Sequence, residues 1–229
     1  NVLGFDPYKV LTYEDSELKT AVALEKAKAH TVEEAYAAPA KAAVFQHYMG
    51  LPMPAEYEDE TGTKHGIEYY LPNSQYEREE HQQAVIADIL KNWVVLSHNG
   101  KFHAIFATAS IQEAVQYYRR LKAEAPNLKI SAIFDANIDN NGHGLMKEQG
   151  LVEIIKDYNA RYGQDFSIPT FKGKKKDIAA RLAHKRPYER IDKSPEQQLN
   201  LLIVVDQMLT GFDSKWINTL YLDKMLYYE

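Results

Sequence analysis

The sequence predicts an α/β fold with a mainly parallel sheet, preceded by a mostly helical N-terminal region. Residues 201–205 form an apolar run without alternation, which is typical of a strand buried on both faces of a parallel sheet. Residues 102–107 and 128–134 are further predicted strands, and the residues between them have helical spacing. A strand–helix–strand unit of this kind requires a parallel, right-handed crossover. Residues 15–49 are rich in Ala, Glu and Lys, which favours helix.

The N-terminal region is expected to cover residues 1–80. Thr31 and Glu34 have the spacing of a capping box, which predicts a helix from Thr31 to about Met49. Residues 55–75 are polar and contain a run of acidic side chains. We interpret that run as a solvated loop in preference to a metal site.

The second domain is expected to cover residues 81–229. Apolar residues at helical spacing over 85–93 predict its first helix. Further helices are predicted over about 144–162 and 175–184, and a last strand over 218–222. At least four strands would then alternate with helices around one sheet.

The composition is that of an ordinary soluble globular chain. Of the 229 residues, 45% are hydrophobic and 26% are charged, and none is cysteine. Disulfides and thiolate metal sites are therefore excluded. No run approaches the roughly 18 apolar residues of a membrane span, and the start does not resemble a signal peptide, so we expect a cytoplasmic protein. A net charge of −5 argues against a free-standing DNA-binding module but leaves room for a local basic stripe.

Two polar segments are expected at the ligand-binding edge of the sheet. The strand at 201–205 is followed by Asp206 and by the turn Thr210–Asp213, which includes Gly211. Loops beyond the carboxyl ends of parallel strands bind ligands, and glycine allows a close approach of the backbone. We expect this loop to lie beside the end of the 102–107 strand. The alternative is an ordinary strand and tight turn, with Asp206 capping the loop.

The second segment follows residue 107. Thr108 and Ser110 end one strand and begin a helix, where hydroxyl and backbone N–H groups can hold a phosphate. The alternative is that Ser110 only caps the helix.

One part of the chain is strongly basic. Its cations could contact DNA phosphates, with Lys174, Lys175 and Arg181 as candidates, or could form a solvated face. The cations are Lys172, Lys174, Lys175, Lys176, Arg181, Lys185, Arg186 and Arg190.

Metal sites are not expected. Asp135, Asn137 and Asp139 imitate the start of a calcium loop, but Asn140 and Met146 stand where that loop needs Gly and Glu. The histidines show no zinc spacing.

Several stretches resemble the R (HsdR) subunits of type I restriction-modification enzymes. The sequence LLIVVDQMLTGFDSKWINTLYLDK at 201–224 is similar to the region around helicase motif V of that family, and GKFHAIFATASIQEAVQYYRRL at 100–121 is similar to the motif IV region. Residues 129–142 and 1–5 fit in the same order. The resemblance implies the second of two RecA-like, three-layer motor domains of a superfamily 2 translocase.

The resemblance also implies roles for single residues. Gly211 and Asp213 would bind nucleotide near the ribose, and Thr210 would contact a DNA phosphate. Thr108 and Ser110 belong to motif IV, which lies near the path of the nucleic acid.

The full-length subunit implied by the resemblance would use ATP and Mg to translocate double-stranded DNA and couple this to restriction cleavage. It would act with methyltransferase and specificity subunits. The sequence contains no G-x-x-x-x-G-K-[ST] motif and no acidic magnesium-binding pair. The family carries these in a first RecA-like domain, expected before Asn1, and an arginine-bearing motif is expected after Glu229.

Phosphoryl transfer needs all of these parts. We therefore expect the isolated fragment to be catalytically inactive and to bind neither cofactor. The alternatives are the equivalent domain of another superfamily 2 helicase and a non-enzymatic α/β interaction module.

Overall fold

The computed structural model describes residues 16–71, 79–134, 144–205 and 214–223. The chain divides into two compact units, Asn1–Gln75 and Tyr76–Glu229, whereas the sequence placed the boundary between residues 80 and 81. Residues 1–5 and the calcium-like stretch at 135–140 lie outside the described residues. Each unit has its own hydrophobic clusters.

The described part of the first unit contains three α-helices. These are α1 (Ser16–Ala27), α2 (Val32–Tyr36) and α3 (Pro39–Met49). The expected cap is confirmed, because Thr31 Oγ1 accepts the backbone N–H of Glu34 at 3.1 Å. The single helix predicted from Thr31 to Met49 is wrong. Ala38 is extended and Pro39 starts α3, as expected for a proline that removes an N–H donor and restricts the residue before it.

The acidic run that we interpreted as a solvated loop belongs to a hairpin. Strand β1 (Glu56–Asp59) pairs antiparallel with β2 (Gly62–His65), and Gly62 has a φ of 115° at the turn. A 3-10 helix, η1 (Ile67–Tyr70), follows and buries Ile67. Nearly every side chain of the hairpin is exposed, so its strands lack the alternation by which a half-buried strand is recognised.

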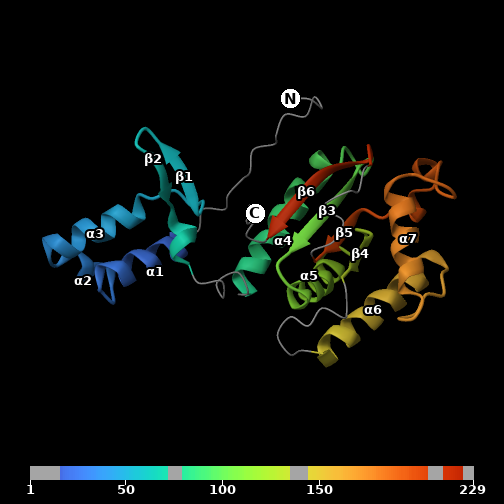
Figure 1. Cartoon of the computed structure of the whole chain (residues 1–229), viewed down its shortest axis with the longest axis horizontal. Coiled ribbons are helices and arrows are strands. Elements are labelled where there is room, and N and C mark those ends of the chain that lie inside the picture. Colours follow the sequence, from blue (N-terminus) through green and yellow to red (C-terminus); the bar gives the residue numbers. More distant parts are fainter. Residues whose placement is uncertain (1–15, 72–78, 135–143, 206–213, 224–229) are drawn as a thin grey trace. The chain divides into compact units, whose positions relative to one another are not determined.

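The second unit confirms the predicted α/β fold (Figure 1). Its helices are α4 (Glu79–Leu96), α5 (Ile111–Glu124), α6 (Gly144–Tyr162) and α7 (Phe171–Leu182), with short 3-10 helices η3 (Ile191–Lys193) and η4 (Pro195–Gln197). Its strands are β3 (His103–Thr108), β4 (Ile130–Ile133), β5 (Leu201–Val204) and β6 (Ile217–Asp223). The four strands pair in the order β4-β5-β3-β6, and every pair is parallel.

Helices cover both faces of this sheet. Ala104 and Phe106 of β3 face a cluster that includes residues of α4, α5 and α6. Ile105 and Ala107 face the opposite cluster, which includes residues of α6 and α7. Since β4 is at the edge of the described sheet, α6 reaches both faces around it. The result is a three-layer α/β/α arrangement of the RecA-like type.

Strand β6 is the other edge of the described sheet. Its side chains alternate between half-buried and exposed. Tyr221 packs against the cluster under α4 and α5, whereas Leu220 and Leu222 on the other face are 51% and 44% exposed. The face of β6 that carries Leu220 and Leu222 is therefore less covered than the rest of the sheet.

Candidate functional site

The candidate site lies where the parallel strands end. Ala107 is paired with Val204, so β3 and β5 reach the same edge of the sheet side by side. This confirms the expected adjacency of the two strand ends. The predicted ligand-binding residues after β5, namely Asp206, Thr210, Gly211 and Asp213, lie outside the described residues.

Thr108 joins the two strand ends. Its side chain is fully buried, and Oγ1 lies 3.4 Å from the carbonyl oxygen of Val204 and 3.2 Å from that of Ser110. A hydroxyl has one proton, so it shares this proton between the two acceptors. Contact of Thr108 with DNA stays a prediction, and the burial of its hydroxyl argues against it in this conformation.

Ser110 caps α5. Its Oγ accepts the backbone N–H of Glu113 at 3.2 Å, and Glu113 Oε2 accepts the backbone N–H of Ala109 at 3.2 Å. The first bond satisfies one of the N–H groups left free where a helix begins, and the second satisfies the N–H of the residue before the cap. The capping role, one of the two readings of Ser110, is therefore observed, and a contact of Ser110 with DNA stays a prediction.

A polar cluster that the sequence did not indicate lies at the same edge. Asp223, the last residue of β6, is paired with Thr108. Its Oδ1 lies 2.7 Å from His81 Nε2 of α4, and its Oδ2 accepts the hydroxyl of Tyr117 from α5. Burial and the charge of Asp223 both raise the pKa of Tyr117, which keeps this hydroxyl a donor. Asp223 thus connects β6 to two helices. The only indication of this in the sequence was an aspartate directly after the last predicted strand.

The basic stretch is divided between the interior and the surface. Lys174 is fully buried, with Nζ 3.0 Å from the carbonyl oxygen of Ala132 and 3.2 Å from Ser131 Oγ. Its ammonium group also lies 5.1 Å from the ring centre of Tyr158. Burial, and to a lesser degree the charge of Lys175, lowers the pKa of Lys174 to about 7.

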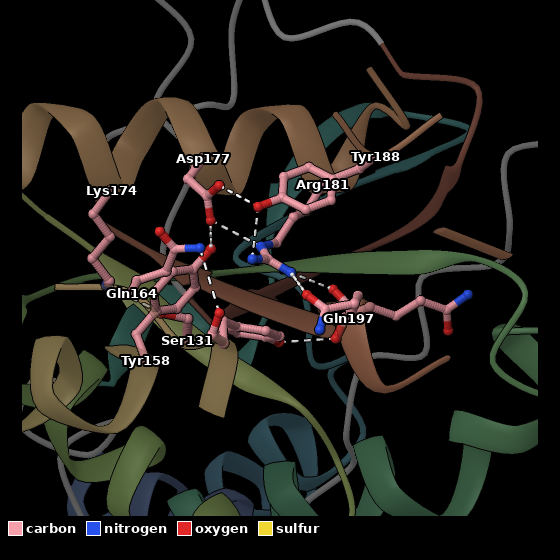
Figure 2. Close-up of polar contacts among 10 residues, drawn as sticks. Ser131, Tyr158, Gln164, Lys174, Asp177, Arg181, Tyr188 and Gln197 are labelled. Carbon is pink, nitrogen blue, oxygen red and sulfur yellow. Dashed lines mark hydrogen bonds and ion pairs between the residues drawn. The ribbon is translucent and has the colours of Figure 1, made fainter. Parts of the chain in front are cut away.

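Arg181 is fully buried as well. Its Nε lies 2.9 Å from Asp177 Oδ2, and its Nη1 donates to the backbone and side-chain oxygens of Gln197 at 2.7 and 3.0 Å. The hydroxyls of Tyr158 and Tyr188 donate to Asp177, both at 2.5 Å. Figure 2 shows Lys174, Asp177 and Arg181 pointing from one helix into this network.

These contacts bear on the predicted DNA contacts. The sequence treated Lys174 and Arg181 as surface cations, but their charged groups are used inside the unit, between α7, β4 and α6. Their burial argues against contact with DNA. Of the three predicted basic contacts, Lys175 alone is partly exposed.

Two histidines meet at the opposite end of β3. His103 begins the strand and is fully buried, and His184 follows α7. Their Nε2 atoms lie 2.8 Å apart, and His184 stacks on Trp216 with ring centres 4.0 Å apart. Burial, followed by the nearby His184, lowers the pKa of His103 to about 4. The pair is therefore neutral at pH 7 and joins β3 to the residues that precede β6.

No group of three or more metal-ligating side chains occurs within the described ranges. The same residues include no helix that is long and apolar enough to cross a bilayer.

Comparisons with known proteins agree with the resemblance. A family described as "Type I restriction enzyme subunit R domain 3" matches residues 100–229. The chain is 32% identical over 157 residues to the endonuclease subunit of the type I restriction enzyme SauCOLORF180P of Staphylococcus aureus (strain COL). It is 30% identical over 156 residues to the SsaAORF53P endonuclease subunit of Staphylococcus saprophyticus. Both alignments cover 64% of this chain and 16% of the relative.

Proposed function

Because the chain belongs to the family of type I restriction enzyme R subunits, we propose that it is the second RecA-like motor domain of such a subunit. It would supply one wall of an ATP site and part of the track along which double-stranded DNA is translocated. The opposite wall would come from a first RecA-like domain, which would hold Mg and the phosphates. Methyltransferase and specificity subunits would complete the complex.

One observation supports this proposal more than any other. Strands β3 and β5 are parallel neighbours, so the chain leaves both at the same edge of the sheet. The segments after them are those similar to motifs IV and V of the family. Ligands of parallel α/β sheets bind at this edge. A motor domain needs its nucleotide-facing and DNA-facing segments close together, because the state of one must be transmitted to the other.

The proposal is tested in the full-length subunit, assembled with its partner subunits. Asp213→Asn and Gly211→Ala are expected to lower DNA-stimulated ATP hydrolysis on the order of 10²-fold, the size expected when a reacting group is misplaced by about 1 Å. Translocation, followed by displacement of a DNA triplex, should fall in parallel.

The matched control is Asp165→Asn, which makes the same chemical change at an exposed residue between α6 and α7. It should leave both activities unchanged. Full ATP hydrolysis by both test variants would mean that the domain is an idle interaction module.

The purified 229-residue chain should show no metal-dependent ATP hydrolysis and no DNA cleavage, because the sequence lacks the phosphate-binding and magnesium-binding motifs. Turnover that survives repurification and depends on added Mg would contradict this.

A further inference from the structure

Residues 171–190, which comprise α7 and the turn after it, hold most of the local positive charge. This stretch contains eight Lys and Arg side chains and two acidic ones, whereas the whole chain has a net charge of −5. Lys174 and Arg181 are buried and account for only part of it. The other six cations face solvent fully or partly: Lys172, Lys175, Lys176, Lys185, Arg186 and Arg190. We call these six the exposed cations.

The exposed cations are not neutralised locally. None of them forms an ion pair with another residue that the structure describes. The nearest acid on the helix, Asp177, already bonds to Arg181 and to two tyrosine hydroxyls. An external anion would therefore meet no competing carboxylate from Asp177.

Their position on α7 does not favour helix stability. The first turn of α7 has no acidic residue, and Lys172 lies in it. A cation there faces the positive end of the helix dipole, which is unfavourable. The presence of Lys172 in the first turn is therefore not explained by a contribution to the stability of α7.

The outward face of α7 is shaped for a broad partner. Buried Lys174, Ile178 and Arg181 define its inner side, and helical spacing places Lys172 and Lys176 on the opposite side. Partly exposed alanines, Ala179, Ala180 and Ala183, follow them before Lys185 and Arg186. Small side chains between two groups of cations let a bulky surface approach closely. The 12-residue helix is about 18 Å long, roughly the rise of five base pairs.

We propose that the exposed cations of residues 172–190 bind the phosphate backbone of double-stranded DNA, independently of its sequence. This inference rests on the proposed motor function, which supplies the partner. The aromatic residues of the stretch, Phe171 and Tyr188, are partly buried and packed in the hydrophobic cluster or bonded to Asp177. Single strands are held largely by stacking on exposed aromatic rings, so the face fits a duplex better than a single strand.

The test measures binding of the 229-residue chain to a fluorescein-labelled 20-bp duplex by anisotropy over a range of KCl concentrations. The variant is Lys172→Ala/Lys176→Ala/Lys185→Ala. Each lost phosphate contact should reduce the slope of log K against log salt by about 0.9. We expect a slope reduced by about two to three and an affinity at least tenfold lower at 0.1 M salt.

Two controls distinguish the effect of this surface on DNA binding from the effect of net charge alone. Lys91→Ala/Lys101→Ala/Lys156→Ala removes the same charge from exposed positions outside residues 171–190. Lys174→Met removes a buried cation from α7 itself. Both should keep the slope and bind within about twofold of the parent chain. Thermal unfolding should show that the Lys172→Ala/Lys176→Ala/Lys185→Ala variant is as stable as the parent chain or slightly more so, because this variant removes a cation from the first turn of α7.

Several results would overturn the inference. These are no duplex binding by the parent chain at 50 mM KCl, an equal loss in either control, or tighter binding of a single strand or an RNA duplex of the same length. The outcome is separate from that of the motor proposal, since binding requires no ATP. If the triple variant loses duplex binding while the Asp213→Asn subunit keeps full ATP hydrolysis, the DNA-binding surface is supported and the motor role is contradicted.

Discussion

At the scale of single residues, buried titratable groups hold the second unit together. Lys174 has no carboxylate partner in the contacts described above and is held by a carbonyl oxygen, a hydroxyl and two aromatic rings. Burying a charged ammonium group costs more than a neutral one, which is why its pKa falls. Lys174 therefore links the stability of the unit to pH.

Replacing Lys174 by Met should remove this dependence. The folded pKa of about 7 lies below the unfolded value near 10.5, so the unfolded chain binds more protons between these values. Parent stability is then expected to rise with pH over this range, by up to roughly 1 kcal/mol per pH unit relative to Lys174→Met. Urea unfolding at pH 7.0 and 9.0 measures it. Tryptophan fluorescence reports on the second unit alone, because Trp93 and Trp216 both lie in it.

The histidine pair should act at the other end of the pH scale. The pKa of His103 is lowered to about 4, below its usual value of 6.5, so its stabilising effect is complete above pH 6.5. It is lost as the pH falls from 6.5 towards 4, on the order of 1 kcal/mol per pH unit. His103→Leu should lose less stability between pH 7.0 and 5.0 than the parent.

His98→Asn is the control for this measurement. His98 is exposed and has a left-handed φ of 49°, which asparagine tolerates. Its pH dependence should equal that of the parent. If His103→Leu and the parent lose the same stability, the pair does not govern the acid response.

At the scale of elements, α5 and α6 pack at a glycine. A Cβ on Gly150 of α6 would lie 2.6 Å from Cγ2 of Val115 in α5, closer than real side chains approach. Val115 is buried and branched at Cβ, so it has little freedom to rotate away. The close contact of these helices therefore depends on glycine at position 150, which has no side chain.

Gly150→Ala should therefore destabilise the second unit by about 1–3 kcal/mol, the usual cost of overpacking, although alanine is the better helix former. Adding Val115→Ala removes the clash. In a double-mutant cycle by urea unfolding, the two changes should cost less together than the sum of their separate effects. Strict additivity would show that the contact does not limit the packing of α5 on α6.

The elements also show what the sequence can predict. Strand β3, helix α5 and strand β5 were predicted because apolar runs and helical spacing reflect burial directly. The break before Pro39 was missed although proline signals it, and the polar hairpin was missed because solvent reaches both its faces. At the candidate site, adjacency of the strand ends was predicted from parallel pairing. The burial of Lys174 and Arg181 was not, because local sequence does not show which face of a charged helix meets the sheet.

At the scale of the whole molecule, the two units are built on separate hydrophobic clusters. The clusters around the parallel sheet contain only residues of the second unit, and those around α1 and α3 only residues of the first. The second unit thus has a core of its own, which is the usual requirement for independent folding.

Residues 76–229 expressed alone should therefore fold. The midpoint of urea unfolding followed by tryptophan fluorescence should lie close to that of the complete chain. The exposed cations are retained in this piece, so duplex binding should persist. A piece that is soluble only in aggregates, or that shows no cooperative transition, would mean that the first unit is needed for folding.

The open flank of β6 has a practical consequence for handling the protein. The outer N–H and C=O groups of β6 have no neighbouring strand in the described sheet, and Leu220 and Leu222 are exposed to solvent. Such an edge can pair with a strand of another molecule and so promote aggregation. Concentrated stocks should scatter light as they age. A lysine in place of Leu220 should keep them clear, because a charge at such a border discourages a second molecule from adding its own strand.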